Sequence, residues 1–145
     1  MYQNDREAVP GFDGNELLYL RYYSGHFSGG QLLPAAIRSQ MKQSVNRGKF
    51  SEPEDVLFSE TGEYDGLGVV EFRVADIPRK VEQPDGPTYV FFMRHEPQAT
   101  NYSHSEIWSD HFPPTGSFKS PSKTVSLEFR IRLCRSIRVN IEAVR

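Results

Sequence analysis

Three of the four histidines in the chain lie within residues 95–111, directly after an apolar run at residues 89–93. Histidine is the side chain whose charge changes nearest neutral pH, so a cluster of this kind is a natural place for acid/base chemistry. No complete catalytic or ligand-binding motif accompanies these histidines. The segment is therefore a candidate site whose reaction the pattern alone does not assign.

His104 and Glu106 are the closest approach to a catalytic pair. On a strand, residues two apart share a face, and a carboxylate beside an imidazole fixes its tautomer and raises its basicity. Arg94 and His95 close the preceding apolar run, and an antiparallel pairing of the two segments brings them near His104. The hypothesis is an acid/base site. His104 is the base, oriented by Glu106; His95 is the second proton carrier, and Arg94 stabilises an anionic intermediate, as in phosphodiester cleavage.

Two further residues are auxiliary candidates for this site. Tyr102 can stack on a base, and His26 lies in a Gly- and Ser-rich segment, residues 24–30, that resembles an anion cradle. That segment lacks the Lys-Ser/Thr ending of a phosphate-binding loop, and its glycines equally serve to reverse the chain. A purely structural interpretation competes throughout: His95 ends a strand, and His104 hydrogen-bonds Glu106 on a sheet surface.

The same residues permit a metal hypothesis. His95, His104 and Glu106 supply the donor types of a non-haem iron site, or three of four zinc ligands with His111 as the fourth. Nothing in the chain matches His-Glu-x-x-His or paired Cys-x-x-Cys, so neither a metal nor a cofactor is predicted.

Charge is distributed unevenly along the chain. The formal net charge is -2, yet residues 117–145 carry +5 and residues 1–116 carry -7. An arginine set predicted on a strand face can dock an acidic protein surface or contact nucleic-acid phosphates. A pI of about 6.1 is far from that of a dedicated nucleic-acid binder, which favours a protein partner. The acidic segment 52–65 is a second candidate docking surface, and the alternative is that both blocks balance within the fold. The arginine set is Arg130, Arg132, Arg135 and Arg138.

Hydrophobic spacing predicts one helix over about residues 31–47. Leu33, Ile37, Met41 and Val45 recur every four residues, and Gly48 follows as a helix-ending residue. Period-two alternation or aromatic enrichment predicts strands elsewhere, after an irregular lead-in at residues 1–15. The strands are expected at 16–23, 67–77, 88–94, 103–109, 127–133 and 137–141, the last two either successive or one kinked strand.

These elements predict an α+β fold: a mainly antiparallel sheet of five or six strands with the 31–47 helix packed on it. The segments 67–77 and 88–94 are expected to pair as a hairpin. A small β-barrel with one helix is the alternative.

The length of 145 residues suits a single domain, 1–145. The single cysteine, Cys134, excludes an intramolecular disulfide and is expected to be a packed thiol. With no signal peptide and no membrane-length apolar run, the expected location is the cytoplasm. The predicted function is a non-catalytic protein-docking module. The alternative is a small metal-independent hydrolase or nuclease using His95, His104, Glu106 and Arg94.

Overall fold

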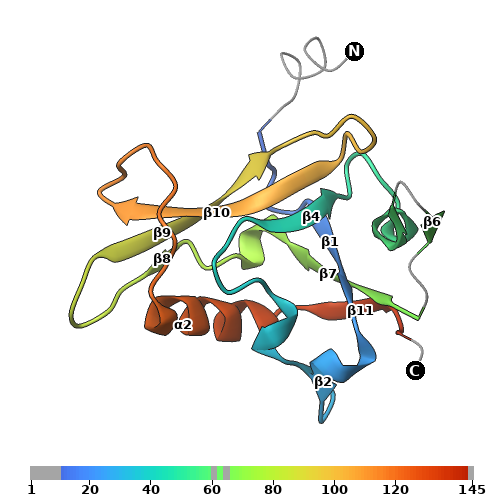
Figure 1. The fold of residues 1–145 in the computed structure, drawn as a ribbon, viewed down its shortest axis with the longest axis horizontal. Coiled ribbons are helices and arrows are strands. Elements are labelled where there is room, and N and C mark those ends of the chain that lie inside the picture. The colour runs from blue at the N-terminus through green and yellow to red at the C-terminus, as the bar shows by residue number, and fades with distance from the viewer. Residues whose placement is uncertain (1–10, 60–61, 64–65, 144–145) are drawn as a thin grey trace.

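The computed structural model describes residues 11–59, 62–63 and 66–143, and its main feature is a seven-stranded antiparallel sheet (Figure 1). Strands β11 and β8 form its two edges, so the sheet is open and the barrel alternative is wrong. In spatial order the strands are β11 (Arg138–Ile141), β7 (Gly68–Arg73), β1 (Leu17–Tyr22), β4 (Gln43–Arg47), β10 (His104–Phe112), β9 (Thr88–His95) and β8 (Lys80–Val81).

One face of this sheet, here called the inner face, is covered by helix α2 (Lys123–Cys134). Figure 1 shows α2 running along the sheet with β11 continuing from its end. Ser122 caps the helix by accepting the Val125 N–H at 3.3 Å. The Phe129 ring stacks on Phe91 with centroids 4.1 Å apart, at the centre of the main hydrophobic core. The α+β prediction with one helix is thus confirmed, and no helix within the described residues is long and apolar enough to span a bilayer.

The helix lies at residues 123–134 and not at the predicted residues 31–47, so the predictions for two segments are wrong. The segment 127–133 was expected as a strand because its apolar residues alternate, and that expectation is wrong. Val125, Phe129 and Leu133 are fully buried at a spacing of four, while Leu127 is 47% exposed. The apolar residues of this segment fit both the strand period of two and the helical spacing of four, and the buried residues follow the helical spacing.

The predicted helix over residues 31–47 is also wrong. Residues 34–36 form a short 3₁₀ turn, η2 (Pro34–Ala36), and residues 43–47 form strand β4. Between them, Met41 and Lys42 adopt left-handed backbone angles, φ 67° and 56°, which no α-helix accommodates. Ile37, Met41 and Val45 are buried as their spacing suggested. Of these, only Val45 lies on a strand, because β4 hydrogen-bonds between β1 and β10, whereas Ile37 and Met41 belong to the irregular segment that precedes it.

Most of the other predicted strands are confirmed, including the antiparallel pairing of β9 with β10 over eight positions. The hairpin of 67–77 with 88–94 is wrong, because β7 pairs with β1 and β11 whereas β9 pairs with β10 and β8. Of the lead-in expected at residues 1–15, residues 1–10 lie outside the described residues. The remaining short elements are β2 (Phe27–Ser28), β3 (Gln31–Leu32), β5 (Phe58–Ser59), β6 (Gly62–Glu63), η1 (Ser24–His26), η3 (Pro53–Leu57) and η4 (Val74–Asp76).

The opposite face of the sheet, here called the outer face, is only partly covered. Turn η3 packs its buried Val56 and Leu57 on Tyr19 of β1 and Val69 of β7, which forms a second, smaller core. The outer face of β4 and β10 lies beside this turn, and it carries the polar residues discussed below.

Cys134 ends helix α2 and is buried. Burial raises the pKa of its thiol to about 11, although the positive charge of Arg130 acts in the opposite direction. Because the thiolate is the reactive form, about one native molecule in a thousand is ionised near pH 8. A thiol reagent such as Ellman's reagent is expected to leave the native protein unmodified for many minutes and to titrate one thiol at once in guanidinium chloride. Rapid native labelling would contradict this burial.

The same shift gives the sign of a pH effect on stability. The folded pKa lies above the unfolded value near 9, so the contribution of Cys134 is fully present below about pH 9. It is lost progressively as the pH rises through about 11, because the unfolded chain ionises first.

Candidate functional site

A cleft of about 750 Å³ opens on the outer face between strands β1 and β4. The two strands pair only at Leu18–Arg47 and Tyr19–Asn46, although both continue further. Beyond that point they line the cleft from opposite sides, with Arg21 on β1 and Ser44 on β4. Turn η3, the loop 98–103 and Ala36 of turn η2 supply the remaining walls, so five separate segments of the chain meet here.

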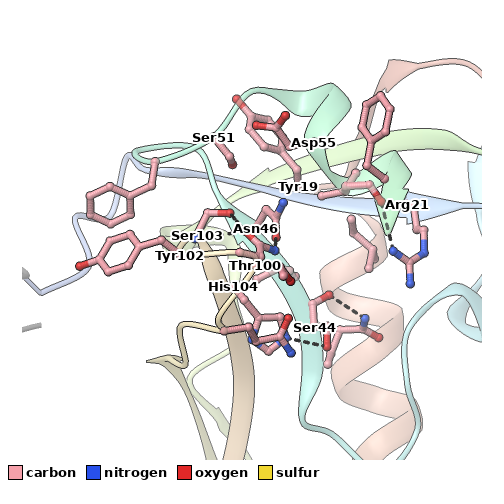
Figure 2. A pocket seen from close by; sticks show the side chains of 18 of the residues that line it. Tyr19, Arg21, Ser44, Asn46, Ser51, Asp55, Thr100, Tyr102, Ser103 and His104 are labelled. Atoms are coloured by element: carbon pink, nitrogen blue, oxygen red, sulfur yellow. Dashed lines mark hydrogen bonds between the residues drawn. The ribbon is translucent and has the colours of Figure 1, made fainter. Parts of the chain in front are cut away.

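His104 is one of the buried polar residues that line this cleft, together with Asn46 and Ser103. Its Nε2 lies 3.1 Å from the hydroxyl oxygen of Ser44 (Figure 2). Its Nδ1 lies 2.7 Å from the backbone oxygen of Glu96. A carbonyl oxygen can only accept, so Nδ1 carries a proton, and the tautomer that this contact selects has its lone pair at Nε2. The Ser44 hydroxyl therefore donates to His104, in the arrangement of a nucleophile with its general base.

A chain of hydrogen bonds holds the wall next to this pair. Asn101 donates its side-chain amide to the Asn46 oxygen at 2.7 Å and accepts from the backbone N–H of Ser103 at 3.2 Å. Because the Asn46 oxygen is used in this way, its amide nitrogen is the group that it can offer to a ligand. Asn46 is buried, lies two residues beyond Ser44 on the same strand face, and lines the same cleft.

The predicted auxiliary residues His26 and Tyr102 also line the cleft. The Nδ1 atom of His26 accepts the backbone N–H of Tyr23 at 3.2 Å, and burial lowers the pKa of its imidazole. Tyr19 lies on another wall, where burial raises the pKa of its phenol, helped by the negative charges of Glu71, Glu52 and Glu54. His26 is consequently neutral near pH 7, and so is the Tyr19 phenol.

His95 lies on the other side of the sheet from His104. It pairs with Ser105, and its Nδ1 lies 3.4 Å from the Ser105 hydroxyl, while His104 and Ser105 point to opposite faces as consecutive strand residues do. Its ring packs against Tyr102 at 4.9 Å. The predicted proton relay between His95 and His104 is therefore not assembled.

Glu106 and Arg94 share the outer face with His104, as the strand period predicted, yet neither is among the residues that line the cleft. Glu106 accepts the indole N–H of Trp108 at 3.1 Å. The group that orients the His104 ring is the Glu96 carbonyl, and not the Glu106 carboxylate that we predicted. Arg94 pairs with the Glu96 carboxylate at 3.1 Å and stacks over Trp108 at 4.0 Å. These two residues thus belong to a neighbouring polar network.

The predicted arginine surface is divided between two elements. Arg130 and Arg132 lie on helix α2, where Arg130 donates to the Pro34 carbonyl and Arg132 pairs with Glu128 at 2.6 Å. Arg135 is the C-cap of the helix, and Arg138 begins β11 beside Glu71. The expectation of one arginine-bearing strand face is therefore wrong, and docking to a protein partner stays a prediction. For the acidic segment 52–65, residues 60–61 and 64–65 lie outside the described part of the chain.

His111, the proposed fourth metal ligand, packs its ring against Tyr89 at 5.0 Å. Among residues 11–59, 62–63 and 66–143, no group of three or more His, Cys, Asp or Glu side chains is placed to hold a metal ion. The donors of the metal hypothesis are thus dispersed over both faces of the sheet.

Ser44 and Asn46 were not among the predicted site residues. Their signal was present as a polar–apolar–polar alternation about Val45, which is typical of a half-buried strand. The prediction of a helix over residues 31–47 hid this alternation.

No protein-family model, curated protein or solved structure matches this chain.

Proposed function

We propose that the protein is a metal-independent hydrolase that cleaves acyl esters, with Ser44 as nucleophile and His104 as general base. The observation that carries the proposal is the position of His104 between two partners, the Glu96 carbonyl at Nδ1 and the Ser44 hydroxyl at Nε2. A base held by a third group and bonded to an exposed serine in a cleft meets the geometric requirements for nucleophilic catalysis.

The reaction runs in two steps. The Ser44 oxygen attacks the acyl carbon while its proton passes to Nε2 of His104, and the resulting imidazolium is stabilised by the Glu96 carbonyl. The tetrahedral intermediate collapses, the ester C–O bond breaks, and His104 gives its proton to the leaving alcohol. Water then attacks the acyl-serine, with its proton again taken by His104, and the carboxylic acid leaves as Ser44 is regenerated.

Asn46 supports the same step. Negative charge develops on the former carbonyl oxygen, and a preorganised donor aimed at that oxygen stabilises the transition state. The Asn46 amide nitrogen is the donor that the Asn101 hydrogen bond leaves for this role.

An activated serine can be tested without knowing the natural substrate. A fluorophosphonate probe is expected to label Ser44, and p-nitrophenyl acetate is expected to be hydrolysed with a burst of nitrophenol. Ser44→Ala should abolish both, while His104→Ala and His104→Gln should lower the rate of labelling by roughly 10²–10⁴-fold, the usual contribution of a general base. Peptide mass mapping identifies the labelled residue.

Ser28 provides the matched control, because it is an exposed serine on a strand and does not line the cleft. Ser28→Ala should label at the wild-type rate. Circular dichroism and melting of each variant separate lost catalysis from lost folding. Labelling of a serine other than Ser44, labelling that is insensitive to His104 in a folded variant, or no labelling at all would each refute the proposal.

A further inference from the structure

The composition of the cleft wall indicates what kind of molecule fits beside Ser44. Four of the described residues that line it carry carboxamides, and three carry phenols. Carboxamides and hydroxyls both donate and accept hydrogen bonds, whereas a carboxylate only accepts and a guanidinium only donates. Gln43 already accepts the Arg38 N–H at 2.6 Å and donates to the Ser44 carbonyl at 3.0 Å, and Asn101 is bonded to Asn46 and Ser103. The Gln98 carboxamide and the Asn46 amide nitrogen are the carboxamide groups left for a ligand, and the hydroxyl groups of a ligand, which donate and accept, complement them. The carboxamides belong to Gln43, Asn46, Gln98 and Asn101.

The aromatic rings of the cleft are unusually exposed. Tyr23 is 60% exposed and Phe58 is 54% exposed, and both line the cleft. Exposed apolar groups with polar neighbours mark ligand-binding grooves. A pyranose ring presents a flat face of C–H groups that packs on such rings while its hydroxyls reach the carboxamides.

The charge of the wall argues against a phosphodiester. The described residues that line the cleft include one arginine, Arg21, and one carboxylate, that of Asp55, so the formal charges of these two side chains cancel. Arg21 also donates to the Val56 carbonyl at 3.1 Å. Nucleic-acid sites instead depend on several lysines and arginines that neutralise the phosphates. The wall therefore suits an uncharged ligand better than a strand of RNA.

We propose that the cleft binds O-acylated sugars and that Ser44 removes their acyl groups. This inference rests on the proposed function, because it assigns a substrate class to the same serine. The sugar lies against the exposed rings of Tyr23 and Phe58, which places it opposite the strand that carries Ser44.

The test compares small esters that differ in the alcohol. The purified protein is assayed with 6-O-acetyl-glucose and monoacetylated xylotriose, and with triacetin and 5′-O-acetyluridine as the non-sugar and nucleoside esters. The sugar esters are expected to give the higher kcat/KM, by roughly tenfold or more. Tyr23→Ala and Phe58→Ala should each raise KM for the sugar esters about tenfold, the factor that corresponds to one lost ring contact.

Phe112 supplies a matched control, since it is 48% exposed and is not among the residues that line the cleft. Phe112→Ala should leave KM unchanged for every ester. If p-nitrophenyl acetate is hydrolysed through Ser44 but triacetin or acetyluridine matches the sugar esters, or the ring variants keep the wild-type KM, the sugar assignment is wrong while the hydrolase proposal stands.

Failure of the hydrolase proposal has a different signature. In that case no ester is hydrolysed in a Ser44-dependent manner. Calorimetric titration of the Ser44→Ala variant with monoacetylated xylotriose then completes the test: heat of binding that Phe58→Ala removes would uphold sugar binding alone, and its absence would overturn it.

Discussion

Glu16→Ala is expected to lower the free energy of unfolding by about 3–5 kcal/mol, the range for breaking a buried ion pair. The Glu16 carboxylate holds the Arg47 guanidinium through two hydrogen bonds of 2.7 Å, and the side chains are 6% and 0% exposed. The Phe12 ring covers the guanidinium at 3.8 Å. Removing Glu16 therefore leaves a buried charge with no counter-ion and little access to water. Urea unfolding at neutral pH measures the loss.

Glu128 offers a comparison, because its pair with Arg132 has a similar N–O distance, 2.6 Å, but is made through one hydrogen bond and lies 43–46% exposed. Glu128→Ala is expected to cost about 0.5 kcal/mol or less. Replacing the whole buried pair, as Glu16→Leu with Arg47→Met, should recover much of the loss, since apolar substitution of both partners is often neutral. Equal effects of Glu16→Ala and Glu128→Ala would show that burial of the pair does not control its contribution.

Phe129→Ala is expected to destabilise the protein by about 3–5 kcal/mol. Its ring is fully buried and stacks on Phe91, so truncation removes the contact between helix α2 and the sheet and leaves a cavity in the main core. Urea or thermal unfolding followed by near-ultraviolet circular dichroism reports the change.

Leu127→Ala distinguishes the helix from the strand that alternation suggested. A strand would place Leu127 and Phe129 on the same buried face, and both truncations would then cost several kcal/mol. In the helix Leu127 is 47% exposed, so its truncation should change stability by about 0.5 kcal/mol or less. A loss for Leu127→Ala comparable to that for Phe129→Ala would contradict the observed helix.

The candidate site was predictable in part. His26, Tyr102 and His104 all line one cleft, as their residue types suggested, and the strand period correctly placed His104 and Glu106 on one face. The partner of His104 was not predictable from that period. Ser44 reaches His104 because β4 inserts beside β10, a contact between residues 60 positions apart.

Local pattern determined most of the buried residues and most of the strands, because alternation and apolar spacing reflect contact with a core whatever the backbone form. Ile37, Met41 and Val45 illustrate this, since all three are buried although the helix assigned to them is absent. Tertiary structure decided between helix and strand for residues 43–47 and 123–134. Two periods fit each segment, and only hydrogen bonding to neighbouring strands, or packing across the finished sheet, distinguishes their energies.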